Sequence, residues 1–287
     1  MSRRKKAACA LLLCLLVVLC GLTGEYFALE NGAFQPVLEG KTVAQDESQP
    51  LETETCAEES LGAAAMAAAM ENMNQALSEQ TAVPESYQIQ EFPMVLQMPQ
   101  LPTGCEITAL TMALQYYGYS VDKTVMASQY LPTAPAEFDY DSDGRRYGPD
   151  MEHNFVGNPF TDWGYICGTS AIVTAANRYL EDQGSSLRAV DRTGATAEEL
   201  YELVSQDTPV VVWVTIGMAD WRTTQGWYTQ AGEYMEWSTN DHGAVLVGYT
   251  PDTVTIADPI AGMVEYSRTQ FEEVFASRGS RCVILEG

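Results

Sequence analysis

A turn that leads into a cysteine and then into an apolar helix is the most constraining feature of this chain. The segment reads Leu101-Pro-Thr-Gly-Cys-Glu-Ile-Thr-Ala-Leu-Thr-Met-Ala-Leu-Gln-Tyr-Tyr-Gly118. Its apolar spacing predicts a helix that begins at Thr103 or Gly104 and ends near Tyr117. Cys105 then lies in the first helical turn, where the positive end of the helix stabilises a thiolate, the reactive form of cysteine.

A reactive cysteine needs a base, and the chain contains only two histidines. His242 opens His242-Gly-Ala-Val-Leu-Val-Gly-Tyr249, an apolar run that predicts a strand, and Asp258 follows shortly afterwards, before Pro259. His153 falls in an irregular polar stretch, and we expect it at the surface. Each group also has an ordinary structural interpretation, because cysteine is often a core residue and Asp-Pro often forms a turn. We favour a nucleophile, its base and an orienting carboxylate.

The order of these segments resembles that of the papain-like cysteine peptidases related to the bacteriocin-processing domains of peptide exporters, in particular their stand-alone extracellular branch. The matching segments run from about residue 92 to the end and are Gln97–Glu106, Phe155–Pro159, Pro209–Val214, His242–Tyr249 and Asp258-Pro259. The resemblance implies that Cys105 is the nucleophile, His242 its base and Asp258 the residue that orients the histidine. It also implies that a glutamine ahead of the cysteine helps to hold the oxyanion, and the alignment selects Gln97 over Gln100.

The rest of this region predicts an α+β fold. Helices are expected at about 169–181, at 196–205, where Thr196-Ala-Glu-Glu199 forms a capping box, and at 266–276. Strands at about 209–216, 242–249, 253–257 and 281–285 predict a largely antiparallel sheet. The resemblance implies the papain-like cysteine peptidase fold, in which an N-terminal helical lobe with the nucleophile helix packs on a mostly antiparallel sheet.

The first 90 residues differ from this domain in composition. Residues 1–24 have a basic head followed by an apolar run, which predicts a signal peptide or an N-terminal membrane anchor. Residues 25–90 hold twelve acidic residues and one lysine and predict an acidic low-complexity spacer, with a possible Ala/Met-rich helix at 60–74. Residues 91–287 form the peptidase-like domain. A basic head stays cytoplasmic, so we expect this domain on the extracellular face of a bacterial cytoplasmic membrane, or secreted.

Charge and cysteine content limit the possible partners. The net charge is −24, and about −28 without the four positive charges of the head, which excludes nucleic acid as a partner. Outside the cytoplasm, Cys167 and Cys282 either form a disulfide or remain buried free thiols.

One acidic segment has the spacing of a calcium loop. Asp139, Asp141, Asp143 and Asp150 occupy the first, third, fifth and twelfth positions, with Gly144 at the sixth. Two arginines inside the segment and the adjacent proline favour an acidic surface turn, so we expect no metal. No zinc spacing, phosphate loop or nucleotide fingerprint occurs in the sequence, and we expect no cofactor. The aromatic segment at 220–240 either lines substrate subsites or serves only for packing.

Together these features predict a monomeric extracellular thiol peptidase that cleaves a peptide or protein substrate through a covalent acyl-enzyme. Two alternatives stay open: a non-catalytic surface module of the same fold that binds a peptide or the cell wall, and a transglutaminase-like acyl transferase. The bacteriocin processors cut after paired glycines, but they do so as cytoplasmic domains fused to a transporter, so that specificity is not transferred to this chain.

Overall fold

The computed structural model of this protein describes residues 69–70 and 83–287. The signal or anchor predicted at 1–24 and most of the predicted spacer therefore lie outside the described residues. Of the Ala/Met-rich segment only residues 69–70 are described, and both are helical. In the described part of the chain, no helix combines the length and the apolar character that crossing a membrane requires.

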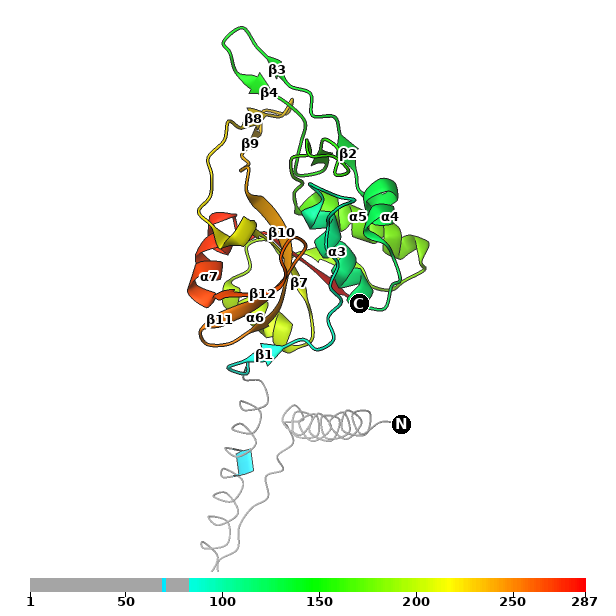
Figure 1. The fold of residues 1–287 in the computed structure, drawn as a ribbon, viewed down its shortest axis with the longest axis vertical. Helices are drawn as coiled ribbons and strands as arrows, with labels where there is room; N and C mark the ends of the chain where they lie inside the picture. Colours follow the sequence, from blue (N-terminus) through cyan, green and yellow to red (C-terminus); the bar gives the residue numbers. More distant parts are fainter. Residues whose placement is uncertain (1–68, 71–82) are drawn as a thin grey trace, which may run out of the picture. The chain divides into compact units, whose positions relative to one another are not determined.

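A seven-stranded sheet forms the centre of the described structure (Figure 1). Its strands follow the order β12-β11-β10-β7-β13-β6, β1 pairs with β10, and every neighbouring pair is antiparallel. This confirms the expected antiparallel sheet. The strands are β1 Tyr87–Gln88, β6 Arg188–Asp191, β7 Val210–Thr215, β10 Asp241–Tyr249, β11 Thr253–Asp258, β12 Gly262–Ser267 and β13 Cys282–Glu286.

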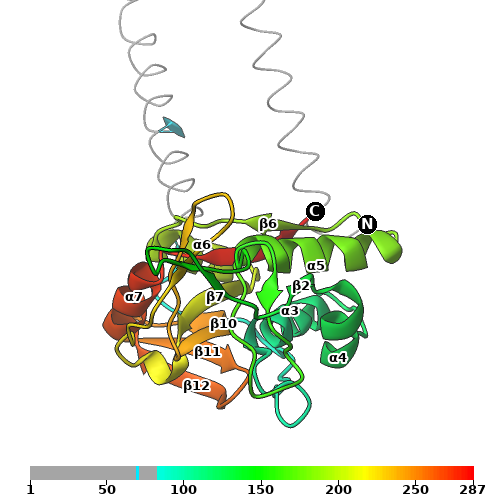
Figure 2. The same ribbon diagram turned by 90° about the horizontal axis from the view of Figure 1, so that it is seen from above.

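Helices cover both faces of this sheet. One side carries α3, α4 and α5, and the other carries α6 and α7 (Figures 1 and 2). All six residues of β7 are buried, as expected for a strand enclosed on both faces, and this explains its uninterrupted apolar sequence. The molecule is therefore an α+β domain. The helices are α3 Cys105–Tyr116, α4 Lys123–Val125 (continued by a π-helical turn, Met126–Tyr130), α5 Thr169–Asp182, α6 Ala197–Ser205 and α7 Arg268–Ser277.

Helix α3 is a core helix, and it confirms the helix predicted from residue 103 or 104 to about 117. Residues 105–114 are all buried, including two threonines. The hydroxyls of Thr108 and Thr111 donate to the carbonyls of Gly104 and Ile107 at 2.7 Å, so these polar groups are satisfied within the helix. The expected capping box of α6 is also present.

Three strands of the central sheet differ from the sequence prediction. Strand β1 and the buried Ile89 belong to the sheet, so the domain begins before the predicted boundary at residue 91. A two-residue strand is too short to show a periodic pattern. Strand β6 was not predicted. Strand β12 is a half-exposed edge strand that ends at Ser267, which caps α7, so this helix begins two residues later than predicted.

Two distant segments form a second, four-stranded sheet, which we call the arm (Figure 1). Its strands are β3 Asp139–Tyr140, β4 Arg146–Tyr147, β8 Trp227–Tyr228 and β9 Tyr234–Met235. Trp227 is fully buried and packs against the rings of Phe138 and Tyr165, with centroids 5.0 and 5.9 Å away. The guanidinium of Arg146 lies 3.6 Å from the centre of the Phe138 ring. Trp227 is therefore a packing residue of the arm.

The calcium-loop spacing does not bring its carboxylates together. The loop between β3 and β4 is a hairpin turn in which Asp141 accepts the backbone N–H groups of Asp143 and Arg145, at 3.0 and 2.8 Å. Asp150 instead bonds to the ring of His153, whose side chain is 65% exposed, as predicted for a surface residue. The described residues contain no cluster of three or more side chains placed to hold a metal ion.

Candidate active site

Three adjoining elements supply the predicted triad. Cys105 is the first residue of α3, His242 is the second residue of β10, and Asp258 is the last residue of β11. Strand β10 pairs with β11 and packs against α3. The structure therefore brings together the three elements that carry these residues. Asp258 contacts His242 directly, whereas no hydrogen bond joins Cys105 to His242 in the described part of the chain.

Gly243 allows the close approach of helix α3 to strand β10. A Cβ atom at this position would lie 2.7 Å from Cα of Glu106, which is closer than real Cβ contacts allow, and 3.0 Å from its backbone nitrogen, which is tighter than most. The backbone N–H of Gly243 also acts to lower the pKa of the Cys105 thiol. The residue that follows the histidine must therefore lack a side chain if the cysteine is to lie beside strand β10.

The imidazole of His242 is held by Asp258. Its Nε2 lies 2.9 Å from Oδ1 of Asp258, and both side chains are buried. Burial opposes the charge of Asp258, but the bond from His242 and the backbone N–H groups of Ile260 and Ala261 keep the pKa of this carboxyl below its usual value. An ionised carboxylate only accepts hydrogen bonds, so Nε2 carries a proton, and in the neutral imidazole the lone pair is then on Nδ1. Nδ1 is buried and has no partner among the described residues.

Cys105 is a buried thiol in this structure, with 8% of its surface exposed. Its sulfur lies 3.3 Å from Oε2 of Glu106 and donates to that oxygen. Burial and the neighbouring carboxylate raise the pKa of Cys105 well above its usual value, although the N–H of Gly243 acts in the opposite direction. The direction is opposite to the one expected from the helix end, because burial of the thiol and the neighbouring Glu106 carboxylate both raise its pKa.

Glu106 is a site residue that the sequence analysis missed. Only 1% of its surface is exposed, and its Oε1 accepts the N–H of Cys167 at 3.4 Å. Burial raises the pKa of Glu106 to about 7. The available signal was an acidic residue inside an otherwise apolar helical face, but an acid in a first helical turn is ordinarily explained by the helix dipole.

The two candidate glutamines differ in burial. Gln97 is buried, whereas Gln100 is exposed. The Gln97 N–H donates to the carbonyl of Pro259 at 2.8 Å, and its side-chain amide donates to the carbonyl of Pro102 at 2.7 Å. Gln97 therefore links the turn after Asp258 to the turn that leads into Cys105. Its amide has a second N–H, which the Pro102 bond leaves available.

Lys123 contacts the backbone around Gln97, and the sequence analysis did not identify it. Its ammonium is buried and donates to the carbonyls of Leu96 and of Gln97, the latter at 2.9 Å. Burial lowers the pKa of Lys123. Because Lys123 donates its hydrogen bonds to carbonyls of this loop, it fixes the backbone that carries Gln97.

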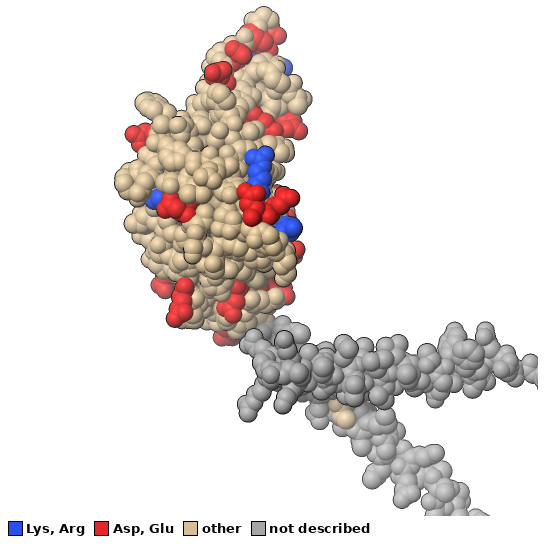
Figure 3. Space-filling view, turned by 90° about the vertical axis from the view of Figure 1, so that its right-hand side faces the viewer, with Lys and Arg blue, Asp and Glu red and all other residues tan. Residues whose placement is uncertain are grey.

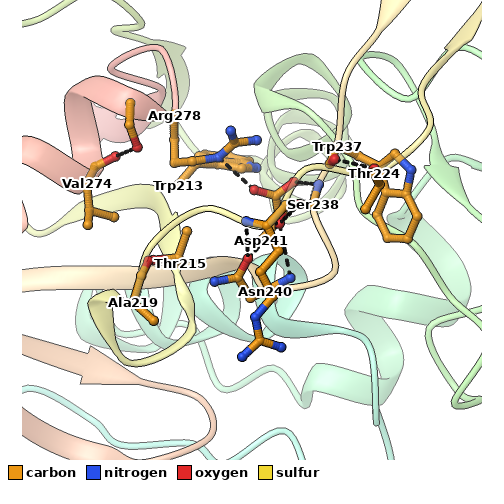
Figure 4. A network of polar contacts seen from close by, with 12 residues as sticks. Trp213, Thr215, Ala219, Thr224, Trp237, Ser238, Asn240, Asp241, Val274 and Arg278 are labelled. Atoms are coloured by element: carbon orange, nitrogen blue, oxygen red, sulfur yellow. Dashed lines mark hydrogen bonds and ion pairs between the residues drawn. The ribbon is translucent and has the colours of Figure 1, made fainter.

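A buried polar network fixes the chain just before His242 (Figure 4). Asp241 forms an ion pair with Arg278, the C-cap residue of α7, at 2.6 Å and accepts the N–H of Ser238 at 2.6 Å. The Asn240 amide donates to the carbonyl of Asp220 at 3.0 Å. These contacts connect the start of β10 to the end of α7 and to the 220–240 segment. They therefore fix the position of the backbone that carries His242.

The remaining described cysteines are buried free thiols. Cys167 and Cys282 form no disulfide with each other, and the sulfur of Cys282 donates to the carbonyl of Arg192 at 3.2 Å. Of the two alternatives left open by the sequence, the structure therefore has the free thiols.

Comparisons with known proteins place the chain in a family. The Peptidase C39-like family model matches residues 89–283. The "Uncharacterized protein YvpB" of Bacillus subtilis (strain 168) is 30% identical over 189 residues, which are 66% of this chain and 71% of the relative. A solved structure described as "an putative C39-like peptidase from Bacillus anthracis" is 31% identical, has a TM-score of 0.62, and covers 71% of this chain and 98% of that chain. The family resemblance read from the motifs is thus confirmed: the chain belongs to the Peptidase C39-like family.

Proposed function

We propose that this protein is a thiol peptidase that hydrolyses peptide bonds through an acyl-enzyme on Cys105. The proposal depends mainly on the hydrogen bonding of the two ring nitrogens of His242. Its Nε2 is held by Asp258, whereas its buried Nδ1 has no partner among the described residues and is free to accept a proton. The strand that carries this imidazole packs directly against the first turn of the cysteine helix. A base fixed by a carboxylate beside a cysteine is the arrangement of nucleophilic catalysis.

Acylation requires one proton transfer and one displacement. Nδ1 of His242 takes the thiol proton while the sulfur of Cys105 attacks the carbonyl carbon of the scissile bond. The negative charge moves to the carbonyl oxygen, where the Cys105 N–H and the second amide N–H of Gln97 are the proposed donors. When the intermediate collapses, the carbon–nitrogen bond breaks, the imidazolium returns its proton to the leaving amine, and a thioester remains on Cys105.

Deacylation repeats these roles with water. His242 removes a proton from a water molecule, whose oxygen attacks the thioester carbon. The carbon–sulfur bond then breaks, the sulfur of Cys105 regains the proton from the imidazolium, and the carboxylic acid leaves. Asp258 keeps the imidazole in one orientation and stabilises its charged form during both halves of the reaction.

The proposed fold and setting follow from the same residues. A helical lobe that carries Cys105 against a sheet that carries His242 and Asp258 supports the papain-like arrangement. The basic and apolar character of residues 1–24 supports an extracellular location, either secreted or attached to the membrane. A monomer is part of the same proposal. Acidic side chains cover more of the face drawn in Figure 3 than basic ones do, which favours neutral or basic peptides as substrates.

One observation favours a second candidate, a non-catalytic binding module of the same fold. Cys105 and His242 are 8% and 1% exposed, and the thiol pKa is raised, so the site is closed in this structure. An acyl transferase, with the same residues and an amine in place of water, differs only in the acceptor.

Labelling with an epoxysuccinyl thiol probe tests the proposal. We expect one adduct per chain, located on Cys105 by peptide mass spectrometry and lost in Cys105→Ala. Cys282→Ala is the matched control, because this residue is also a buried free thiol, and it should label like the parent protein. A protein that takes up no probe, or takes it up on Cys167 or Cys282, would support the binding module instead.

A further inference from the structure

Glu106 is the polar group in direct contact with the proposed nucleophile. Its Oε2 lies 3.3 Å from the sulfur of Cys105, while Oε1 accepts the N–H of Cys167. The catalytic cycle proposed above does not use this carboxylate. A glutamine would accept the Cys167 N–H equally well, so packing and that hydrogen bond do not explain why the residue is an acid.

Within the described ranges, no lysine or arginine forms an ion pair with Glu106. Among the described residues no ion pair involves Glu106, and the titratable groups that face it are Cys105 on its own helix, His242 on β10 and Cys167 before α5. Asp258 lies behind the imidazole. A buried carboxylate without a cationic partner is poorly stabilised, and its pKa rises to about 7.

We propose that Glu106 and Cys105 share one proton across the Oε2–sulfur contact, so that Glu106 is a catalytic residue that holds the nucleophile as a thiol. When the carboxylate is charged, the S–H bond points to Oε2, and a thiolate beside a second negative charge is unfavourable. When the proton moves from sulfur to Oε2, the S–H bond breaks, an O–H bond forms, and the negative charge passes to sulfur. The neutral acid then donates a hydrogen bond to the thiolate. This inference rests on the proposed function, since it concerns the reactivity of the same thiol.

The two groups must then influence each other reciprocally. Removing the charge of Glu106 lowers the pKa of the thiol, and removing the thiol donor raises the pKa of Glu106, because the S–H bond stabilises the carboxylate. A carboxyl group with a purely structural role would show neither effect.

The test is the alkylation rate of Cys105 by iodoacetamide between mildly acidic and alkaline pH, followed by peptide mass spectrometry. In Glu106→Gln we expect the inflection at least about one pH unit lower than in the parent, and alkylation at neutral pH at least about tenfold faster. Glu152→Gln is the matched control: Glu152 acts on the neighbouring Cys167 but does not contact Cys105, so its profile should coincide with that of the parent. Coinciding profiles for Glu106→Gln and the parent would overturn the inference.

A second measurement covers the case in which Glu106→Gln fails to fold. The infrared carbonyl band of a neutral buried carboxyl, followed against pH, should persist to higher pH in Cys105→Ala than in the parent. A band with the same pH midpoint in both proteins would also refute a shared proton. The proposed function fails separately, if Cys105 of the parent protein is not alkylated at any pH or if its rate does not depend on His242.

Discussion

Replacing Gly243 by alanine tests whether the close contact between α3 and β10 creates the site. The added Cβ would lie 2.7 Å from Cα, 2.9 Å from Cγ and 3.0 Å from the nitrogen of Glu106. Carbon atoms in favourable contact are about 3.5–4.0 Å apart, so the start of α3 must retreat by about 1 Å. The obstacle is helix backbone, which cannot rotate away as a side chain can.

This displacement should affect activity more than stability. Overpacking of this kind costs about 1–3 kcal/mol of unfolding free energy, whereas a misplacement of about 1 Å between reacting groups costs about 100-fold in rate. We therefore expect Gly243→Ala to remain folded, as measured by urea unfolding. Its rate of peptide cleavage, or of Cys105 labelling, should fall by about two orders of magnitude.

Gly248→Ala is the matched control on the same strand. Its Cβ would meet mainly the end of the Gln88 side chain, at 2.1 Å from Oε1, with the nearest backbone atom at 3.1 Å. That side chain can rotate out of the way, so we expect a small loss of stability and nearly full activity. Similar activities in the two variants would refute the argument that Gly243 positions the cysteine helix.

Three further predictions follow from the same contacts. Asp258→Asn should keep the melting temperature of the parent and lose about 100-fold or more in turnover, because the carboxylate that holds the imidazole is gone. Unchanged turnover would show that Asp258 only shapes the turn. Folding raises the pKa of Glu106 from 4.5 to about 7, so between these pH values the folded state binds a proton that the unfolded state has lost. The free energy of unfolding, measured in urea, should therefore fall by about 3 kcal/mol as pH rises across this interval. Glu106→Gln should lack this fall, and an equal fall in both proteins would contradict the raised pKa of Glu106. A chain that begins at residue 91 should melt several degrees below one that begins at residue 83, because it lacks β1 and the buried Ile89; equal melting would show that the spacer extends to residue 90.

The sequence predicted those parts of the site that have local signals. The turn before Cys105 and the apolar periodicity after it determine where α3 begins, and the β-branched run after His242 determines β10. Their meeting point was predicted by the family resemblance and by the lone plausible histidine. Gly243 explains how the two elements come into contact, since only a residue without a side chain lets α3 approach β10 this closely.

The parts that the sequence did not predict depend on tertiary burial. The position of Cys105 at a helix start predicted a low thiol pKa, but burial and the contact with Glu106 raise this pKa in the folded protein. Lys123 looks like a surface lysine until the carbonyls around its ammonium are known. The pairing of Tyr147 with Tyr228 in the arm joins segments about eighty residues apart, and no local pattern indicates it.

Cleavage of an unbiased peptide library by the purified protein tests the central claim most directly, with products identified by mass spectrometry. The account predicts new peptide ends that depend on the protein, are absent with Cys105→Ala and His242→Ala, and remain with Cys282→Ala. An acyl thioester on Cys105 should be trapped by rapid acid quenching. A library left uncut by the parent protein, or cut equally by Cys105→Ala, would contradict a peptidase that acts through this cysteine.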